Sequence, residues 1–406
     1  MRDVVITGAG VVSALGNTRT LFVERLFAGR SGVREITRFD ATRFRSRLAG
    51  EADPAGLDAA ASGAFGHEIA RMDRFVRYSV IASRAACTES DIGNGHGTPP
   101  GGVVCVGVGM GGLPHIENGI LLQESQGVRR TRPYLIPSLI PNMAAAMISL
   151  DLGFEGAQYT FSSACASGTQ ALGEAFHSIR RGQRKWALAG GTEAVITPIT
   201  YSGFQAIHAL SCRNDAVTPR PFDCGRDGMV VGEGAAMFVL EDAEHAAARA
   251  AVPLGRVTGY ATTSGGGGIT LRSSEAAGRC MAEALEDAGA RAEDLDVIFA
   301  QAPGMSHDDR ELAAIRTVFN STRPAITSPE GHLGHTFAAS GPLSLAAVLG
   351  AFERQEIPPT LNLDTPDVGF EQMDLVSQRR ASRVDRCLIN SFGFGGINAS
   401  LVCIRS

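Results

Sequence analysis

The stretch YTFSSACASGTQALGEAF, residues 159–176, joins a β-rich run to a helix-forming run and has one cysteine, Cys165, between them. Residues 159–161 are strand-like, and apolar side chains recur at helical spacing after Cys165, at Ala171, Leu172, Ala175, Phe176 and Ile179. Cys165 is therefore predicted at a helix N-terminus, where free backbone N–H groups favour a thiolate and can stabilise an oxyanion. Because cysteine is not rare in strand-to-helix turns, spacing alone leaves a structural cysteine as the alternative.

Apolar runs that resemble strands recur along the whole chain, and stretches with helical spacing, such as residues 276–295, lie between them. This alternation predicts an α/β layered protein with strands buried on both faces. The layout repeats on either side of a break at residues 241–253, so we predict two similar halves, residues 1–250 and 251–406. The apolar runs are VVITGAGVVS (4–13), VVCVGVGMGG (103–112), WALAGGTEAVI (186–196), AAMFVLED (235–242), VPLGRVTGYAT (252–262), DLDVIFAQA (294–302) and CLINSFGFGGINASLVCI (387–404).

Composition describes an ordinary globular chain of 406 residues with 44% hydrophobic residues and a formal net charge of -5. That charge argues against nucleic acid or an acidic membrane as the main partner. The first residues lack the charged flank and cleavage site of a signal peptide, and no apolar run is long enough to span a bilayer. We expect a cytoplasmic protein.

Cofactor signatures are weak. The eight cysteines occur singly, without a CxxC pair or a neighbouring histidine at ligand spacing, so no metal site is predicted. The segment VVITGAG (4–10) has Ser13 where a dinucleotide loop needs its third glycine, so no bound nucleotide is predicted either.

Four segments in the same order resemble the β-ketoacyl-ACP synthases, the elongating ketosynthases of fatty acid and polyketide synthesis. SSACASGTQA (162–171) resembles their active-site elbow, and IPSLIPNMAAAMISLDLGFEGAQYT (136–160) the segment before it. RPFDCGRDGMVVGEGAAMFVLE (220–241) resembles the signature after the elbow, and NSFGFGGINASLV (390–402) resembles the C-terminal gate loop. The resemblance implies a thiolase fold, a pseudo-duplicated five-layered αβαβα sandwich that dimerises through the strand before the nucleophile.

The resemblance also implies the chemistry. The cysteine takes an acyl group from the phosphopantetheine arm of acyl carrier protein, and two histidines assist decarboxylation of malonyl-carrier and the Claisen condensation. Cys165 matches the cysteine, and His335 in LGHTFAASG (333–341) matches the second histidine. His332 falls outside the motif and is expected to be a surface or structural residue.

The first histidine has no counterpart. DLDVIFAQAPGMSHDDRE (294–311) aligns Gln301 with it, and an ungapped alternative places Ala300 there instead. Gln301 can donate a hydrogen bond to an enolate but cannot titrate. Loss of a positioned acid/base typically lowers the rate by about 10²- to 10⁴-fold.

Other family positions around this pocket are also altered. The two threonines that hold the pantetheine arm become Pro303 and Met305, and a lysine five residues before the second histidine becomes Glu330. His307 lies nearby, but it would have to fold back to take part in catalysis. Such a degenerate pocket resembles the chain-length-factor subunit of type II polyketide synthases, many of which have glutamine where this chain has Cys165.

Two functions therefore stay open. In the first, the chain is a chain-length-factor-like subunit that pairs with a catalytic ketosynthase as a heterodimer. In the second, it is a self-sufficient β-ketoacyl-ACP synthase or acyltransferase, a homodimer that uses Cys165 with His335.

Two further sites come from the resemblance. Phe394 matches the gate phenylalanine, whose backbone N–H also contributes to the oxyanion hole together with that of Cys165. Arg129 and Arg130 resemble the basic turn that receives the acidic carrier protein.

Overall fold

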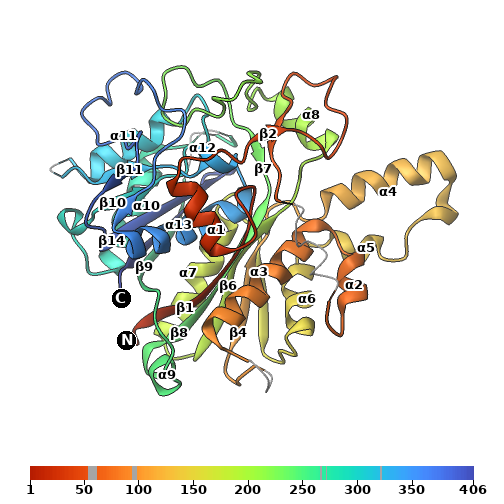
Figure 1. Cartoon of the computed structure of the whole chain (residues 1–406), viewed down its shortest axis with the longest axis horizontal. Coiled ribbons are helices and arrows are strands. Elements are labelled where there is room, and N and C mark those ends of the chain that lie inside the picture. Colours follow the sequence, from red (N-terminus) through yellow and green to blue (C-terminus); the bar gives the residue numbers. More distant parts are fainter. Residues whose placement is uncertain (54–61, 94–97, 266–267, 271, 321) are drawn as a thin grey trace.

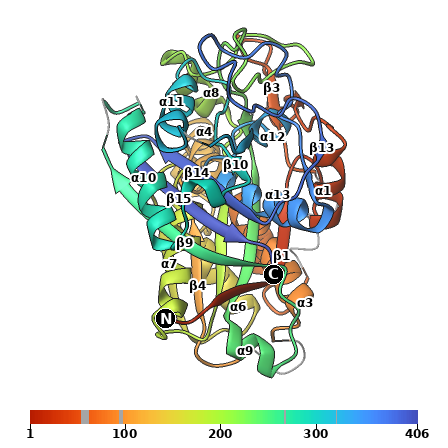
Figure 2. The ribbon, with the colours of Figure 1, turned by 90° about the vertical axis from the view of Figure 1, so that its left-hand side faces the viewer.

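The computed structural model describes residues 1–53, 62–93, 98–265, 268–270, 272–320 and 322–406. Ten strands form one hydrogen-bonded sheet in the order β11-β10-β14-β15-β9-β1-β8-β6-β4-β5 (Figures 1 and 2). The first half of the chain supplies β1 (Val4–Val12), β4 (Val103–Gly107), β5 (Ala157–Phe161), β6 (Trp186–Glu193) and β8 (Gly234–Asp242). The second half supplies β9 (Gly255–Ser264), β10 (Val297–Phe299), β11 (Ala325–Thr327), β14 (Arg386–Gly393) and β15 (Ile397–Ile404).

The two halves repeat one topology. In each, the third strand pairs with the second, followed by the fourth, the fifth and the first. The second strand is parallel to the third and the fourth, and the remaining pairs are antiparallel. The halves meet where β1 pairs with β9, at Val4–Val257, Val5–Arg256 and Ile6–Gly255. The division at residue 250 itself stays a prediction.

Helices complete five layers around these two half-sheets. α3 (Arg74–Ser90) and α6 (Met143–Asp151) cover the outer face of the first half. α7 (Ser167–Arg180) and α13 (Ser340–Arg354) lie between the halves and contact strands of both. α10 (Ser274–Asp287), with α11 (Asp309–Val318) beside it, covers the second half, as Figure 2 shows. The predicted thiolase-type sandwich is thus the fold of this chain.

The side chains of α7 and α13 suit helices that are enclosed between the two half-sheets. Every residue of α13 from Ser340 to Phe352 is buried, as expected for a helix enclosed on all sides. α7 buries the five apolar positions that the sequence predicted, together with the small polar residues Ser167 and Thr169. Strands β1, β4, β6, β8 and β10 are buried along their whole length, whereas β5, at the end of the sheet, is partly exposed.

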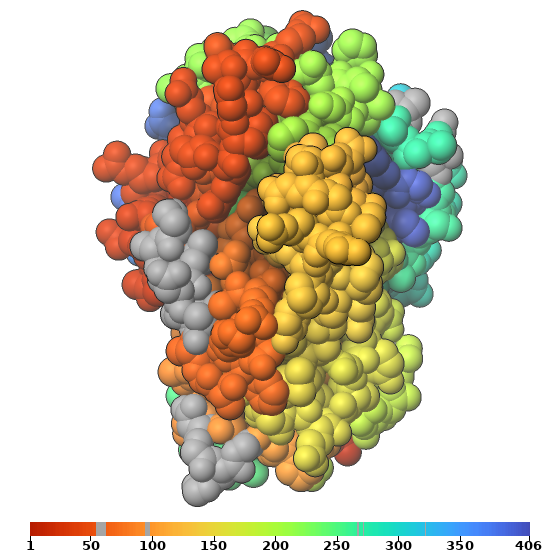
Figure 3. Space-filling model, turned by 90° about the vertical axis from the view of Figure 1, so that its right-hand side faces the viewer, coloured from red at the N-terminus to blue at the C-terminus, as the bar shows by residue number. Residues whose placement is uncertain are grey.

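The remaining elements surround this core. α4 (Leu113–Gln126) projects from the body of the molecule in Figure 1, and its segment stands out in yellow-orange on the face shown in Figure 3. The smaller elements are α1 (Arg19–Phe27), β2 (Arg34–Glu35), β3 (Leu48–Gly50), α2 (Gly66–Arg71), η2 (Val128–Arg130), α5 (Leu135–Leu139), α8 (Pro198–Ala206), β7 (Val231–Gly232), α9 (Ala243–Ala248), η3 (Ala292–Asp294), α12 (Glu330–Leu333), η4 (Phe337–Ala339), β12 (Glu356–Ile357) and β13 (Arg380–Ala381).

Candidate active site

Cys165 lies in the sharp turn between β5 and α7, two residues before the first residue of the helix. Ala164 has φ 51°, a left-handed conformation that is uncommon for alanine and costs of order 1–3 kcal/mol. The turn is held by Ser167, whose hydroxyl accepts a hydrogen bond of 2.8 Å from the backbone N–H of Ser163. The half-buried thiol therefore stands at a fixed place in front of the α7 N-terminus.

A glycine allows the central helices to approach each other at this point. A Cβ atom on Gly168, in the first turn of α7, would lie 2.1 Å from the carbonyl oxygen of Ala338. Ala338 belongs to η4, the turn that leads from His335 into α13. Without a side chain at Gly168, Cys165 and His335 come together although they are 170 residues apart in the chain.

His335 is fixed through its backbone and both ring nitrogens. Its N–H donates to the carbonyl oxygen of Val230 at 2.7 Å, and its carbonyl oxygen accepts from the N–H of Gly232 at 2.8 Å. Its Nε2 lies 3.0 Å from the Sγ of Cys165, and its Nδ1 lies 2.9 Å from Oε2 of Glu330. Sulfur, imidazole and carboxylate therefore form a continuous row.

The Glu330 carboxylate is buried and held from its other side. The Ser340 hydroxyl donates to Oε1, so each carboxylate oxygen has one partner. Burial disfavours a charged imidazole, but the Glu330 carboxylate and, after it, the Cys165 sulfur raise the pKa of His335 well above its ordinary value. The lysine that the resemblance implied at this position is thus replaced by a group of opposite charge in direct contact with the histidine.

Gln301 follows β10 and is locked in a buried polar network. Its Oε1 accepts hydrogen bonds from the backbone N–H of Phe392 at 2.7 Å and from the Arg272 guanidinium at 3.2 Å. Both partners can only donate, which fixes the oxygen there and leaves the amide NH₂ as the free end of the side chain. Arg272 also pairs with the buried carboxylate of Glu311 at 3.1 Å.

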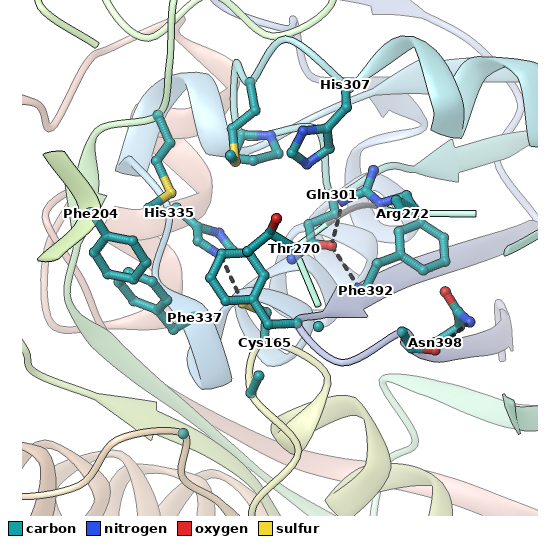
Figure 4. A pocket seen from close by; sticks show the side chains of 18 of the residues that line it. Cys165, Phe204, Thr270, Arg272, Gln301, His307, His335, Phe337, Phe392 and Asn398 are labelled. Carbon is teal, nitrogen blue, oxygen red and sulfur yellow. Dashed lines mark hydrogen bonds between the residues drawn. The ribbon is translucent and has the colours of Figure 1, made fainter. Parts of the chain in front are cut away.

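These side chains line one cavity of about 200 Å³ (Figure 4). Cys165, His335 and Gln301 supply polar groups to a wall that is otherwise mainly apolar. Such a cavity suits an acyl chain whose reactive end lies at the cysteine. The apolar wall consists of Met110, Phe204, Met229, Pro303, Met305, Phe337, Phe392 and Phe394.

Phe394 lies half-buried in the turn between β14 and β15 and belongs to a row of aromatic rings. Its centroid is 6.3 Å from that of Phe204, which stacks on Phe337 at 5.5 Å, and the Phe337 ring lies 4.6 Å from the His335 ring. A Cβ atom on Gly393 would lie 2.7 Å from the carbonyl oxygen of Ser163 and 3.3 Å from the backbone nitrogen of Cys165. Glycine there lets the turn pass close to the nucleophile.

The structure gathers four of the predicted site residues in this cavity, namely Cys165, His335, Gln301 and Phe394. The two arginines predicted for carrier docking lie elsewhere: Arg129 and Arg130 are exposed on η2, at the end of the α4 projection.

Two histidines outside the expected pair differ from each other. His332 is buried, with its ring nitrogens 2.9 Å and 2.8 Å from the carbonyl oxygens of Arg30 and Pro359, which is a structural role. His307 does line the cavity, although its distance along the chain argued against this. Burial and, after it, the nearby arginines lower the pKa of His307 to about 4, so its ring is neutral at pH 7.

Sequence reasoning missed the partners of the central residues. Glu330 was visible only as a lost lysine, Glu311 only as the acidic residue that anchors the ungapped alignment, and Arg272 gave no motif at all. Glu193 was also missed; its carboxylate accepts N–H groups from residues 109–111 and so shapes the loop after β4. A carboxylate five residues before a catalytic histidine was the one signal that could have identified Glu330.

Within the described ranges, no helix is long and apolar enough to cross a membrane. The same residues contain no group of three or more histidine, cysteine, aspartate or glutamate side chains that could hold a metal ion.

A duplicated five-layered sandwich with a cysteine elbow facing a histidine across its centre is the architecture of the condensing-enzyme class of proteins. Residues 1–246 match the family "Beta-ketoacyl synthase, N-terminal domain" and residues 254–364 match "Beta-ketoacyl synthase, C-terminal domain". The chain belongs to the β-ketoacyl synthase family, the ketosynthases of fatty acid and polyketide biosynthesis.

Individual relatives cover the whole chain. The "3-oxoacyl-[acyl-carrier-protein] synthase 2" of Coxiella burnetii is 37% identical over 100% of this chain and 99% of its own. The solved structure titled "The ishigamide ketosynthase/chain length factor" superposes with a TM-score of 0.94 at 31% identity, covering 100% and 99% of the two chains. A type II polyketide ketosynthase solved in complex with its acyl-carrier protein, AntDE:AntF, has a TM-score of 0.89 at 26% identity and covers 100% and 99%.

Proposed function

We propose that this chain is a chain-length-factor-like subunit, which pairs with a catalytic ketosynthase and shapes the tunnel for the growing acyl chain. The observation that carries the proposal is Gln301. Its amide aligns with the family's first histidine, is held by Phe392 and Arg272, and cannot titrate. Decarboxylative condensation by this chain alone should therefore be slow.

Two features support the partnership. β5, the strand before Cys165, is one of the two edge strands of the sheet, with Tyr159 53% exposed and Leu150 on the neighbouring helix 47% exposed. An uncovered edge strand is a template for pairing with another chain. The acyl carrier protein is the second proposed partner, because Arg129 and Arg130 project from the surface where an acidic protein can reach them.

Reconstitution with a ketosynthase that has the cysteine and both histidines tests this function. The full chain, alone or with that ketosynthase, is supplied with acyl-carrier and malonyl-carrier, and the two-carbon-extended product is measured by mass. We expect extension only in the mixture, persisting with Cys165→Ala in this chain. Cys165-dependent extension by this chain alone would overturn the proposal.

That contrary result would establish the second candidate, a self-sufficient synthase or acyltransferase that works as a homodimer. The 3.0 Å contact between Cys165 and His335 favours it, and so does the full-length similarity to 3-oxoacyl-[acyl-carrier-protein] synthases. In either case no resident cofactor is proposed, and the phosphopantetheine arm of the carrier enters as part of the substrate. The eight unpaired cysteines suit a reducing compartment, for which we propose the cytoplasm.

A further inference from the structure

We propose that Cys165, His335 and Glu330 form a nucleophile–base–carboxylate triad that hydrolyses acyl thioesters of pantetheine. The row of contacts, Sγ to Nε2 at 3.0 Å and Nδ1 to Oε2 at 2.9 Å, has the connectivity of hydrolase triads, in which the third group orients the base. This activity goes beyond a chain-shaping role, because shaping a tunnel requires no nucleophile.

The buried carboxylate determines which nitrogen of His335 has the proton. A carboxylate can only accept, so Nδ1 donates its hydrogen to Glu330 in both protonation states of the ring. In neutral His335, Nε2 then has a lone pair directed at Cys165. A family histidine that stabilises an enolate must instead donate from the nitrogen that faces the substrate. The Glu330 contact therefore favours His335 acting as a base through Nε2 over neutral His335 acting as a hydrogen-bond donor through Nε2.

The first half-reaction transfers the acyl group to the enzyme. The Cys165 thiolate attacks the thioester carbonyl, and the backbone N–H groups of Cys165 and Phe394, the oxyanion hole that the family resemblance implies, stabilise the oxyanion. The new C–S bond to Cys165 remains as the bond to pantetheine sulfur breaks. The leaving thiolate takes the proton from Nε2 of His335, which becomes neutral.

The second half-reaction uses water. Neutral His335 takes a proton from water through Nε2 while the oxygen attacks the acyl-cysteine carbonyl. The C–S bond then breaks, a carboxylic acid is released, and the Cys165 thiolate faces an imidazolium again. Because Gln301, which aligns with the family's first histidine, cannot titrate, the competing use of the acyl-enzyme, condensation with decarboxylated malonyl-carrier, lacks the acid/base of that position.

The test uses the full chain with hexanoyl-pantetheine and measures hexanoic acid and pantetheine thiol in parallel with intact mass. We expect turnover that disappears in Cys165→Ala. Glu330→Gln is expected to lower kcat at least about 10²-fold, because Glu330 acts on His335, and KM should fall as well because slower deacylation lets the acyl-enzyme accumulate. Burst measurements should then show acyl-Cys165 accumulating in this variant.

A matched control separates this positioning role from simple loss of stability. Glu241 is also a buried glutamate that contacts a histidine, with Oε2 2.7 Å from Nδ1 of His245, but it lies outside the cavity. Glu241→Gln should retain wild-type kcat per folded molecule. In deacylation, Glu330→Gln should also move the acid limb of the pH profile to lower pH, because the lost carboxylate no longer raises the pKa of His335.

Three results would overturn the proposal: a stable acyl-Cys165 adduct without acid release in the wild type, no adduct and no acid, or hydrolysis that survives Cys165→Ala. Equal losses of kcat in Glu330→Gln and Glu241→Gln would overturn the role of Glu330. This assay measures hydrolysis and not elongation. A negative result would therefore overturn the triad without deciding the proposed subunit function, which the reconstitution tests separately.

Discussion

The backbone N–H of Phe392 donates a 2.7 Å hydrogen bond to Oε1 of Gln301, and this bond fixes the amide at the wall of the cavity. Gln301→His restores a titratable group at that position. We expect condensation by the chain alone to rise at least about tenfold, as two-carbon extension measured by mass. The gain is limited because the Arg272 charge next to the new imidazole disfavours its protonated form.

Gln301→Asn is the control for this prediction, since it keeps an amide and adds no titratable group. A Gln301→His protein that folds normally and shows no gain would mean that the missing histidine is not what limits condensation.

The close approach of α7 to η4 predicts a cost for any side chain at Gly168. In Gly168→Ala the new methyl group would meet the carbonyl oxygen of Ala338 at 2.1 Å, so α7 must shift. We expect the free energy of unfolding to fall by about 1–3 kcal/mol. The alkylation of Cys165 by iodoacetamide should also slow as its contact with His335 is lost.

Gly203 in α8 is the control for this prediction: substitution there should have the opposite effect on the free energy of unfolding, measured with denaturant. No atom lies within 4 Å of a Cβ built there, and the residue is exposed within a helix. Gly203→Ala should therefore raise stability by about 0.5–1 kcal/mol. Equal effects of the two substitutions would contradict the packing argument.

Asp287 connects α10 to α7 and predicts a pH-dependent stability. Its Oδ1 lies 2.5 Å from the Arg180 guanidinium, and its Oδ2 accepts from the Tyr260 N–H at 3.0 Å. Although burial alone raises it, these bonds lower the pKa of Asp287 below its ordinary 3.8. The stabilisation is therefore present above pH 3.8 and is lost as the pH falls through the lower folded-state value.

Denaturant unfolding of Asp287→Asn at several pH values measures this effect. We expect a loss of about 1–3 kcal/mol at pH 7, which shrinks below pH 3.8. Asp3→Asn breaks only the exposed 3.6 Å pair with Arg256 and should change stability little at any pH. A pH-independent loss in Asp287→Asn would assign the effect to packing instead of charge.

The basic turn at the end of α4 predicts salt-dependent binding of the carrier protein. Arg129→Glu with Arg130→Glu should weaken carrier binding at low salt, mainly through a slower association rate. The difference should disappear at high salt. Arg379→Glu with Arg383→Glu makes the same change in net charge at exposed positions elsewhere and serves as the control. Unchanged affinity of the first variant at low salt would exclude this turn as the docking site.

Local patterns were sufficient for much of the fold. Side-chain periodicity, which can be read from the sequence, predicts the strand β5, the helix α7 and the position of Cys165 between them. The single run 387–404 forms two strands, β14 and β15, because glycines at its centre make the turn that contains Phe394. The thiolase fold and the family came from ordered motifs, and the loss of the first histidine was visible in the same way.

The sequence by itself thus determined the fold class, the family, the candidate nucleophile Cys165 and the candidate position Gln301, where the family motif has its first histidine. Only the tertiary structure decided what surrounds them. In the folded chain Glu330 contacts His335, Arg272 contacts Gln301, and His307 lines the cavity. These contacts depend on how helices and loops far apart in the chain pack against each other. A residue's partner within about 3 Å is set by this packing and leaves no periodic signal in the chain, so a carboxylate that appeared only as a lost lysine became the partner of His335.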